Sequence, residues 1–321
     1  MEPLNLEALE AAAAIVHRVM APTPHYPWPL LSQRTGCTVW LKHENAAPTG
    51  AFKVRGGLVH LERLKRDRAG LKGVVAATRG NHGQSVAFAA ARLGLEARIV
   101  VPHGNSPDKN RAMRALGAAL VEHGHDFQAA LEEAERLAGD DNIAFVRSFH
   151  PDLVAGVASY ALELFRAAPG LDAVYVPIGL GSGICGVIAA RDALGLKTEV
   201  IGVVSEGAPT YALSFEAGKA VSTNRADTMA DGLACRVPVP EALTLIKRGA
   251  SHVVTVSDAA ILEAIGILFS DTHQIAEGAA AAPLAALLQE RGRMAGKTVG
   301  LIISGGNIDA DLYRQALATL D

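Results

Sequence analysis

One lysine stands in a sequence context that could make it chemically reactive. Lys53 follows a Thr-Gly turn and Phe52. It begins a stretch whose apolar residues recur at helical spacing (Val54, Leu58, Leu61). This context predicts a partly buried lysine in the first turn of a helix. Burial lowers the pKa of a lysine, and an unprotonated amine can act as a nucleophile or form a Schiff base. In isolation such a lysine is more often a solvated surface charge, so the prediction depends on other motifs.

Residues 78–84 (Thr-Arg-Gly-Asn-His-Gly-Gln) form the first of three polar or glycine-rich loops. They follow a predicted strand and precede a helical pattern, so backbone amides at this turn can bind a carboxylate. Asn81 offers a neutral amide for a phenolic or carbonyl oxygen. For this loop alone, an ordinary helix-capping turn is the stronger interpretation, and a lone histidine such as His82 is more often structural than catalytic.

Residues 179–186 (Gly-Leu-Gly-Ser-Gly-Ile-Cys-Gly) form the second loop. Its glycines allow backbone N–H groups to surround an anion such as a phosphate. The loop could be mistaken for a dinucleotide-binding GxGxxG motif, but Ile184 stands where the third glycine would be. A nicotinamide-dependent dehydrogenase is therefore the weakest of the functional alternatives.

Ser304 belongs to the third loop, residues 304–307, directly after a predicted strand. It would lie at the carboxyl end of that strand, where open parallel sheets bind ligands, and its alternative role is to cap the helix that follows. Glu277 opens another helix and is expected in its first turn, where the helix dipole favours an acid. An amine, an anion-binding loop, an asparagine and a hydroxyl are more specific together than any one of them.

The elements that must position these loops alternate between strands and helices. β-Branched runs predict strands at 38–41, 73–77, 97–101, 143–146, 173–177, 200–204, 252–256 and 298–303. Helical patterns lie at 84–93, 107–116, 128–137, 154–166, 258–271 and 309–316. This alternation predicts an α/β fold whose parallel sheets are built from βαβ units.

Composition argues against several classes of protein. The 321 residues are 50% hydrophobic and only 5% aromatic, with a net charge of −3, so neither nucleic-acid nor membrane binding is expected. The cysteines lack metal-ligand spacing and indicate reduced thiols in a cytoplasmic protein (Cys37, Cys185, Cys235). Residues 1–20 lack the pattern of a secretion signal, and the longest uncharged apolar stretch, 278–288, is too short to span a bilayer.

Taken together, the motifs resemble those of the fold-type II pyridoxal-phosphate enzymes, in particular the serine/threonine dehydratase and serine racemase group. The resemblance covers nearly the whole chain, and the motifs occur in the family's order. It implies two open, mostly parallel twisted sheets flanked by helices (the tryptophan synthase β-like fold), with the cofactor in the interdomain cleft. Residues 1–45 and 151–321 would form the large cofactor-binding domain and residues 46–150 the small one. It also implies a homodimer that acts on a small amino-acid substrate.

The same resemblance implies roles for the site residues. Lys53 would be the catalytic residue and would hold pyridoxal phosphate through a Schiff base. Asn81 would contact the pyridoxal 3-oxygen, and Ser304 would be the hydroxyl partner of the pyridine nitrogen. The other implied cofactor contacts are Phe52, Gly179, Leu180, Gly181, Ser182, Gly183 and Glu277. The implied substrate contacts are Thr78, Arg79, Gly80 and His82.

Within this family the loop around Asn81 resembles that of the dehydratases, because β-replacement enzymes usually have threonine where this chain has His82. The implied reaction converts a 3-hydroxy amino acid to a 2-oxo acid and ammonia, and Lys53 would remove the α-proton. Threonine, serine, phenylserine and 3-hydroxyaspartate are the candidate substrates. Racemisation and β-replacement on the same fold are alternatives, as is a non-catalytic sensor of a phosphorylated ligand.

Three features depart from the family pattern. Arg79 stands where these enzymes usually carry a small residue, commonly the serine that acts as second acid–base group in serine racemases, which argues against racemisation. Arg79 either narrows and charges the pocket around the β-substituent or points outward toward a surface acid. Glu206 matches one acidic ligand of a divalent-cation site, but the second position is Ala212, so no metal site is predicted. Leu180 and Ser182 make the glycine loop stiffer.

Overall fold

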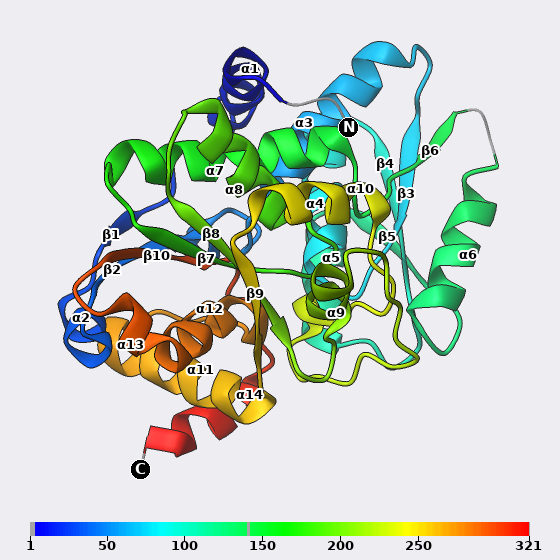
Figure 1. Cartoon of the computed structure of the whole chain (residues 1–321). Coiled ribbons are helices and arrows are strands. Elements are labelled where there is room, and N and C mark those ends of the chain that lie inside the picture. Colours follow the sequence, from blue (N-terminus) through cyan, green and yellow to red (C-terminus); the bar gives the residue numbers. More distant parts are fainter. Residues whose placement is uncertain (1–3, 140–141, 321) are drawn as a thin grey trace.

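The computed structural model describes residues 4–139 and 142–320, which form two sheets flanked by helices (Figure 1). In spatial order the larger sheet contains β1 (His25–Pro27), β2 (Thr38–His43), β10 (Thr298–Ile303), β7 (Ala173–Pro177), β8 (Glu199–Ser205) and β9 (His252–Val256). The smaller sheet contains β5 (Ala118–Glu122), β4 (Glu96–Val101), β3 (Gly73–Ala77) and β6 (Ile143–Phe145). Among the strand pairs of the described residues, only β1–β2 is antiparallel. The predicted fold class is confirmed.

Helices connect the strands of both sheets. Those in the first half of the chain are α1 (Leu6–His17), α2 (Pro29–Thr35), α3 (Lys53–Asp67), α4 (Asn81–Arg92), α5 (Pro107–Ala115), α6 (Phe127–Leu137) and α7 (Pro151–Ala167). Those in the second half are α8 (Ser182–Ala193), α9 (Thr210–Ala217), α10 (Pro240–Gly249), α11 (Asp258–Thr272), α12 (Gly278–Gln289), α13 (Arg291–Met294) and α14 (Ala310–Leu317). Several begin at a side-chain cap; the hydroxyl of Ser257, for example, accepts the backbone N–H of Ala260 at the start of α11.

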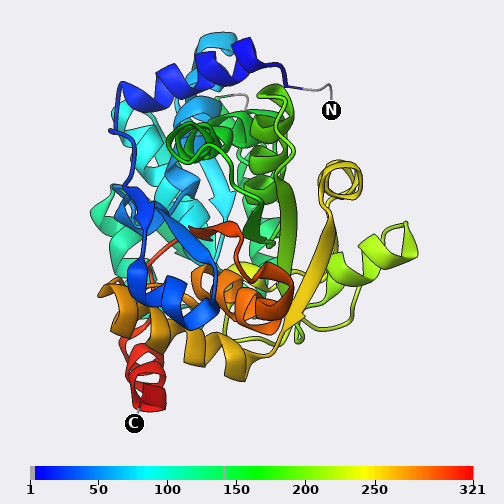
Figure 2. The same ribbon diagram turned by 60° about the vertical axis from the view of Figure 1, so that its left-hand side comes forward.

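The helices form layers on the two faces of the larger sheet. Figure 1 shows α7, α8 and α10 on one side of this sheet and α11, α12 and α13 on the other. In the view of Figure 2, α1 (dark blue) runs across the top of the molecule, where it packs on α7 and α3. Helices α3, α7 and α8 are therefore the central layer between the two sheets.

Within the described ranges the hydrophobic core has three parts, and the largest spans both sheets. It includes Val74 of β3, Val176 of β7 and Val157 of α7, each almost completely buried. A second part fills the space between the larger sheet and α11 and α12, and a third lies under α6 on the smaller sheet. Because one core spans both sheets, the helices between them are held from either side.

The predicted strands agree with the observed ones to within one or two residues, but two strands were not predicted. Strand β1 has three residues and contains a proline, and β5 is a partly exposed edge strand that begins with two alanines. Neither has the buried β-branched pattern on which the predictions depended. The strands of the smaller sheet lie between residues 46 and 150, and those of the larger sheet lie before residue 45 and after residue 151, while the division into domains stays a prediction.

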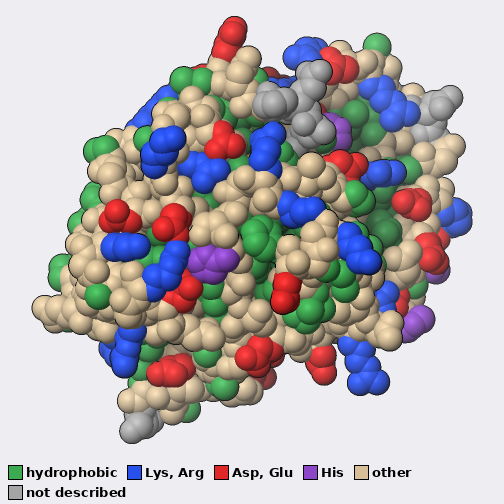
Figure 3. Space-filling model, viewed as in Figure 1, with side chains coloured by type: hydrophobic (Ala, Val, Ile, Leu, Met, Phe, Trp, Pro, Cys, Tyr) green, Lys and Arg blue, Asp and Glu red, His purple; other side chains and the backbone are tan. Residues whose placement is uncertain are grey.

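Charged side chains of both signs are interspersed over the face shown in Figure 3. No helix in the described ranges has both the length and the apolar character needed to cross a bilayer. The three cysteines are buried as free thiols (Cys37, Cys185, Cys235).

Candidate active site

Lys53 is the first residue of α3, in agreement with the sequence prediction. Gly50, in the left-handed region with φ of 68°, turns the chain just before it. After this turn, Ala51 forms an antiparallel bridge with the loop that follows β10, and the backbone N–H of Phe52 donates to the carbonyl of Ser304 (3.0 Å). These backbone contacts place Lys53 beside the loop that carries Ser304.

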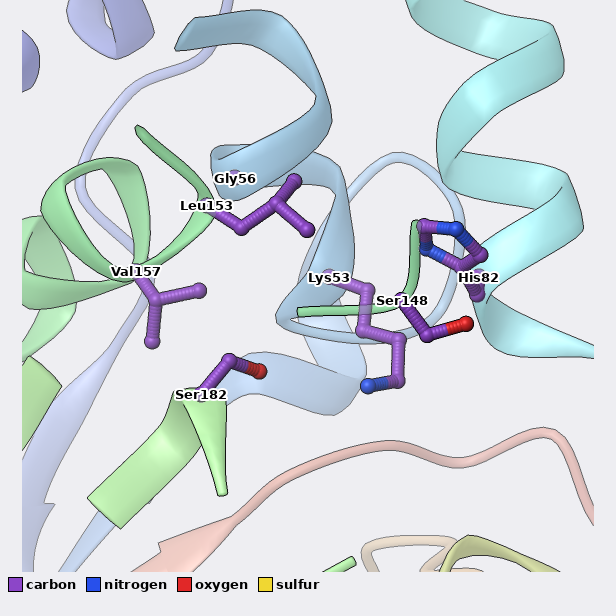
Figure 4. Close-up of a pocket in the computed structure, with 7 residues that line it drawn as sticks. All are labelled: Lys53, Gly56, His82, Ser148, Leu153, Val157 and Ser182. Atoms are coloured by element: carbon purple, nitrogen blue, oxygen red, sulfur yellow. The ribbon is translucent and has the colours of Figure 1, made fainter. Parts of the chain in front are cut away.

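The Lys53 side chain points into a small pocket between the two sheets (Figure 4). The pocket is lined by Lys53, Gly56, His82, Ser148, Leu153, Val157 and Ser182. The Lys53 amine lies 4.9 Å from the centre of the Phe52 ring. Within the described part of the chain this amine forms no hydrogen bond and no ion pair. Lys53 is half-buried, and within the described residues its amine has no charged partner at contact distance.

Burial lowers the pKa of two residues of this pocket, with a different chemical consequence for each. It lowers the pKa of the Lys53 amine from 10.5 to about 8, although the negative charge of Glu277 acts in the opposite direction. Burial, together with the positive charge of Lys53, lowers the pKa of His82 to about 3. The imidazole of His82 is therefore neutral at physiological pH, and its Nε2 lies 3.4 Å from the carbonyl of Val146. A larger fraction of the Lys53 amine is therefore unprotonated near neutral pH, whereas His82 is left as a neutral hydrogen-bonding group.

The lowered pKa of Lys53 predicts a distinct pH profile for its reactivity in the cofactor-free protein. Labelling by an amine-specific reagent, followed by mass spectrometry, should reach half of its maximal rate near pH 8 at Lys53. Exposed Lys65 on the same helix is labelled in the same sample and controls for reagent and peptide recovery. A half-maximal rate at Lys53 near the ordinary lysine value of about 10.4 would contradict the effect of burial.

The glycine loop after β7 is held close to neighbouring backbone. A Cβ atom at Gly179 would lie 2.2 Å from the carbonyl oxygen of Gly232, so a side chain there has no room. Gly181 has φ of 100°, in the left-handed region that only glycine adopts readily. Ser182 then begins α8, and within the described residues its buried hydroxyl makes no hydrogen bond. The loop and the helix start together provide backbone N–H groups suited to an anion.

Tyr160 connects this loop to the lysine. Its hydroxyl donates to the carbonyl of Gly183 (3.2 Å), and its ring packs edge-on against Phe52 with 6.1 Å between the centroids. Leu180 is held similarly, because its carbonyl accepts the hydroxyl of Tyr211 (3.0 Å). The predicted cofactor contacts Phe52, Leu180 and Gly183 are thus fixed by two buried tyrosines.

Asn81, predicted to contact the cofactor, is part of a polar cluster. Its Nδ2 donates to both carboxylate oxygens of Glu277 (2.8 and 3.1 Å), and its Oδ1 accepts from Asn307 (2.8 Å). Glu277 stands at the N-cap of α12 rather than in its first turn, and its side chain does not cap the helix. Burial raises the pKa of the Glu277 carboxyl, and the hydrogen bond from Asn81 opposes this shift. Asn307, which the sequence did not single out, connects Asn81 to the carbonyl of Thr49 (2.9 Å).

The loop before α4 presents backbone amides without acceptors. The Thr78 hydroxyl accepts the amides of Gly80 (2.9 Å) and of the next helical turn. The amides of Arg79, Asn81 and His82 have no acceptor in the described part of the chain. The Arg79 side chain is exposed and has no carboxylate partner there, so neither a pocket contact nor an outward ion pair is formed.

A buried ion network lies behind the lysine, around Arg55. The Arg55 guanidinium donates to Glu163 (2.6 and 3.0 Å) and to Glu44 (2.7 and 3.0 Å). Lys42 also donates to Glu163, so two buried cations face two buried carboxylates, and the partly exposed His17 contacts Glu163 at the edge of the network (2.8 Å). Burial alone would raise the pKa of the Glu163 carboxyl, but Arg55 and Lys42 lower it to about 2. The network joins β2, α3 and α7 and fixes the first turn of α3, to which Lys53 belongs.

Comparisons with known proteins identify the family. The family model described as pyridoxal-phosphate dependent enzyme matches residues 16–305. This chain belongs to that family. An L-threonine ammonia-lyase of Thermotoga maritima is 36% identical, over 96% of this chain and 77% of that protein. An L-threo-3-hydroxyaspartate ammonia-lyase of Saccharomyces cerevisiae is 30% identical, over 91% and 89%.

The solved structure of a pyridoxal 5'-phosphate-dependent aspartate racemase has the same fold, with a TM-score of 0.91 and 28% identity over 96% of this chain and 97% of that one. The resemblance to fold-type II pyridoxal-phosphate enzymes, and pyridoxal phosphate as cofactor, are confirmed by these comparisons.

The described residues of this pyridoxal-phosphate dependent enzyme fit the cofactor. Lys53 supplies an amine of lowered pKa, the loop at 179–183 has no room for a side chain at Gly179, and the buried residue Ser304 supplies a hydroxyl. Within the described chain, that hydroxyl makes no hydrogen bond of its own. Lys53 and Ser182 line one pocket, and the residues just before Lys53 pair with the loop that carries Ser304.

The structure brings most of the predicted site residues together and separates a few. Lys53, His82 and Ser182 line one pocket, whereas Arg79 is exposed. Glu206 is also exposed, so the position that resembled a cation ligand faces solvent. Sequence reasoning missed Ser148, which lines the pocket from the segment before α7. Its position before the Pro-initiated helix α7 was the available signal.

Proposed function

We propose that this protein is a lyase that converts a 3-hydroxy amino acid to a 2-oxo acid and ammonia. The candidate substrates are L-threonine, L-serine and bulkier or acidic analogues such as phenylserine and 3-hydroxyaspartate. One observation carries the proposal: a lysine with a pKa of about 8 lies in one pocket with the start of an anion-binding helix. The names of the relatives, ammonia-lyases for threonine and 3-hydroxyaspartate, support the same reaction.

When bound, pyridoxal phosphate supplies an electron sink next to the substrate's α-carbon. In our proposal Lys53 is the residue that carries the cofactor and then takes the α-proton. A pKa of about 8 keeps a useful fraction of the amine unprotonated near neutral pH, and the amine can return the proton afterwards. Residues 179–183 would hold the phosphate, and Asn81, Glu277 and Phe52 would surround the ring.

The loop before α4 is the proposed site for the substrate carboxylate. The amides of Arg79, Asn81 and His82 lack acceptors within the described residues, and the N-terminus of α4 favours a negative charge. Thr78 keeps the loop in this conformation by accepting two of its other amides. A carboxylate held here fixes the α-carbon of the substrate relative to the loop, so orientation is set before proton transfer.

Ser304 is the proposed partner of the cofactor's ring nitrogen. A neutral hydroxyl stabilises a protonated nitrogen less than a carboxylate would, so the ring withdraws electrons less strongly. This setting favours prompt loss of the β-hydroxyl over accumulation of a carbanion. It therefore supports elimination rather than slow exchange at the α-carbon.

Racemisation is the second candidate, because an aspartate racemase shares the fold. It requires an acid–base group on each face of the α-carbon. Arg79 occupies the position at which serine racemases carry their second such group, and an arginine stays protonated at working pH. The exposed position of its side chain does not provide that group.

The deciding experiment is an assay of 2-oxo acid release over both enantiomers of serine and threonine, with phenylserine and 3-hydroxyaspartate. Release from any member supports the proposed lyase and names its preference. Chiral chromatography of the same mixtures detects racemisation. If the opposite enantiomer forms and no 2-oxo acid is released, the protein is a racemase and the lyase proposal is wrong. If protein that has incorporated the cofactor gives no product in either assay, the proposed reaction is wrong.

Arg79 is proposed to favour substrates with an acidic β-substituent. It is an exposed cation without a partner in the described chain, beside amides that would hold the substrate. Arg79→Ser should lower kcat/KM for 3-hydroxyaspartate relative to threonine by about tenfold, or about 1.4 kcal/mol, and the effect should shrink at high salt. Exposed Arg92→Ser at the end of α4 is the control. An unchanged preference in Arg79→Ser would leave Arg79 without a role in selectivity.

We also propose that the protein is a cytoplasmic homodimer. The family resemblance and the free cysteines support this, and Tyr26 and Leu30 leave about half of their surface exposed near the start of α2 (49% and 52%). Light scattering that gives the mass of a single chain would contradict the dimer. Recovery of the protein in the membrane or secreted fraction would contradict the location.

A further inference from the structure

A second cluster of chemically active side chains lies outside the lysine pocket, where α3 meets the start of α7. It consists of His60, His150 and Asp152, and the candidate ligand atoms of the three lie within 4.8 Å of one another. His60 is in α3, His150 is the N-cap of α7, and Asp152 is in its first turn. His60 is buried, whereas the side chain of His150 is 42% exposed, so the cluster opens to solvent on one side.

Two of the distances in this cluster are compatible with metal ligands. Nδ1 of His60 and Nδ1 of His150 each lie 3.3 Å from Oδ2 of Asp152. Charge-assisted hydrogen bonds are shorter, about 2.7–2.9 Å. Two ligands bound tetrahedrally at about 2.0–2.1 Å from a Zn²⁺ ion are separated by about 3.3–3.4 Å. Both contacts therefore have the length of one edge of such a coordination tetrahedron.

The hydrogen bonds around the cluster orient its groups. The backbone N–H of Asp152 donates to Nδ1 of His150 (3.2 Å), so a metal bound through this nitrogen would take the lone pair from that hydrogen bond. Arg63 donates to the other carboxylate oxygen, Oδ1 (2.6 Å), which leaves Oδ2 directed at both imidazoles. Orienting hydrogen bonds of this kind are typical around metal ligands.

We infer that His60, His150 and Asp152 form a site for a divalent transition metal of the Zn²⁺ type. Two neutral imidazoles and a carboxylate are the ligands, and water takes the fourth position on the exposed side. Because Arg63 adds a positive charge beside the carboxylate, binding is weaker than at closed four-ligand sites. The site differs from the position around Glu206, which lies in another part of the chain.

A metal at this position would connect two walls of the lysine pocket. His60 lies two turns after Lys53 on α3, and His150 lies two residues after Ser148, which lines the pocket. The ion would therefore hold the segment before α7 against α3. Its effect on the pocket is conformational, because none of its ligands lines the pocket.

The test uses chelator-treated full-length protein without a histidine tag, titrated with Co²⁺ and Zn²⁺. His150→Asn removes an imidazole and keeps a good helix N-cap, so folding should be retained. His125→Asn is the matched control, because exposed His125 lies beside Asp126 (3.7 Å) but has no third ligand. We expect one equivalent of Co²⁺ with the intense visible absorption of tetrahedral coordination in the wild type and in His125→Asn. Affinity should fall at least about tenfold in His150→Asn.

Calorimetry with Zn²⁺ should give the same order of affinities, and Zn²⁺ should raise the Tm of the wild type more than that of His150→Asn. Weakly absorbing six-coordinate Co²⁺ in the wild type, or equal affinities in wild type and His150→Asn, would overturn the inference. The Co²⁺ spectrum of the wild type alone tests whether the coordination is tetrahedral, even if a variant does not fold. These readouts do not depend on turnover. They therefore test the metal site independently of the proposed reaction.

Discussion

Lys53→Ala is expected to lower 2-oxo acid production by at least about 10⁴-fold, which corresponds to about 5.4 kcal/mol of transition-state stabilisation. The variant loses both the group that would carry the cofactor and the base that would take the α-proton. In the described part of the chain no neighbouring side chain can replace it. His82, the other titratable group of the pocket, has a pKa lowered to about 3 by burial and holds a proton too weakly to return it near neutral pH.

The measurement needs a readout that does not depend on turnover. After cofactor loading and borohydride reduction, peptide mass spectrometry should find the cofactor attached to Lys53 in the wild type. Lys65→Ala, at an exposed position of the same helix, should retain both attachment and activity. Attachment without 2-oxo acid production in the wild type would preserve the role of Lys53 as anchor and reject the reaction. Substantial production by Lys53→Ala would reject the catalytic assignment itself.

The fold could be predicted from the sequence where strands are buried on both faces. Strands β3, β7 and β10 are runs of β-branched and small residues with almost no exposed positions, and their bounds were predicted correctly. The start of α4 was placed three residues late, because the polar residues 81–83 hide a helical turn that begins at Asn81. Periodicity is informative only where one face of an element is apolar.

The candidate site was predictable to the extent that each loop directly follows a strand. Parallel strands bring their carboxyl ends to one edge, so the lysine, the glycine loop and Ser304 could be placed together before any geometry was known. Asn307 could not be assigned a partner in this way, since its contact with Asn81 joins residues 226 positions apart. The same holds for Arg55 and Glu163, which are 108 positions apart. Sequence spacing carries no signal for such pairs.

Glu163→Gln is expected to lower the free energy of unfolding by about 3–5 kcal/mol, the usual cost of removing one partner from a buried ion pair. Glutamine has nearly the same shape, so packing is retained while the charge is lost. Arg55 and Lys42 would then share the single carboxylate of Glu44 in a region that is fully buried. Urea unfolding at neutral pH measures the difference.

The control is Glu62→Gln, which removes the exposed ion pair between Glu62 and Arg18 (2.6 Å). That pair is accessible to water, so its loss should cost no more than about 1 kcal/mol. Equal destabilisation by the two substitutions would mean that the buried Arg55 network contributes no more to the free energy of unfolding than an exposed ion pair. A stabilising effect of Glu163→Gln would contradict the assignment of Glu163 as an ionised partner.

The dependence on pH separates charge from shape in this network. Arg55 and Lys42 keep the pKa of Glu163 at about 2, below its ordinary value of 4.5, against the effect of burial. A depressed carboxyl pKa stabilises the folded state fully above about pH 4.5, and this contribution is lost as the pH falls toward 2. The stability difference between wild type and Glu163→Gln should therefore narrow over this interval, whereas a difference caused by packing would stay constant. Because Arg55 lies two residues after Lys53, loss of the network should also weaken cofactor retention by the lysine.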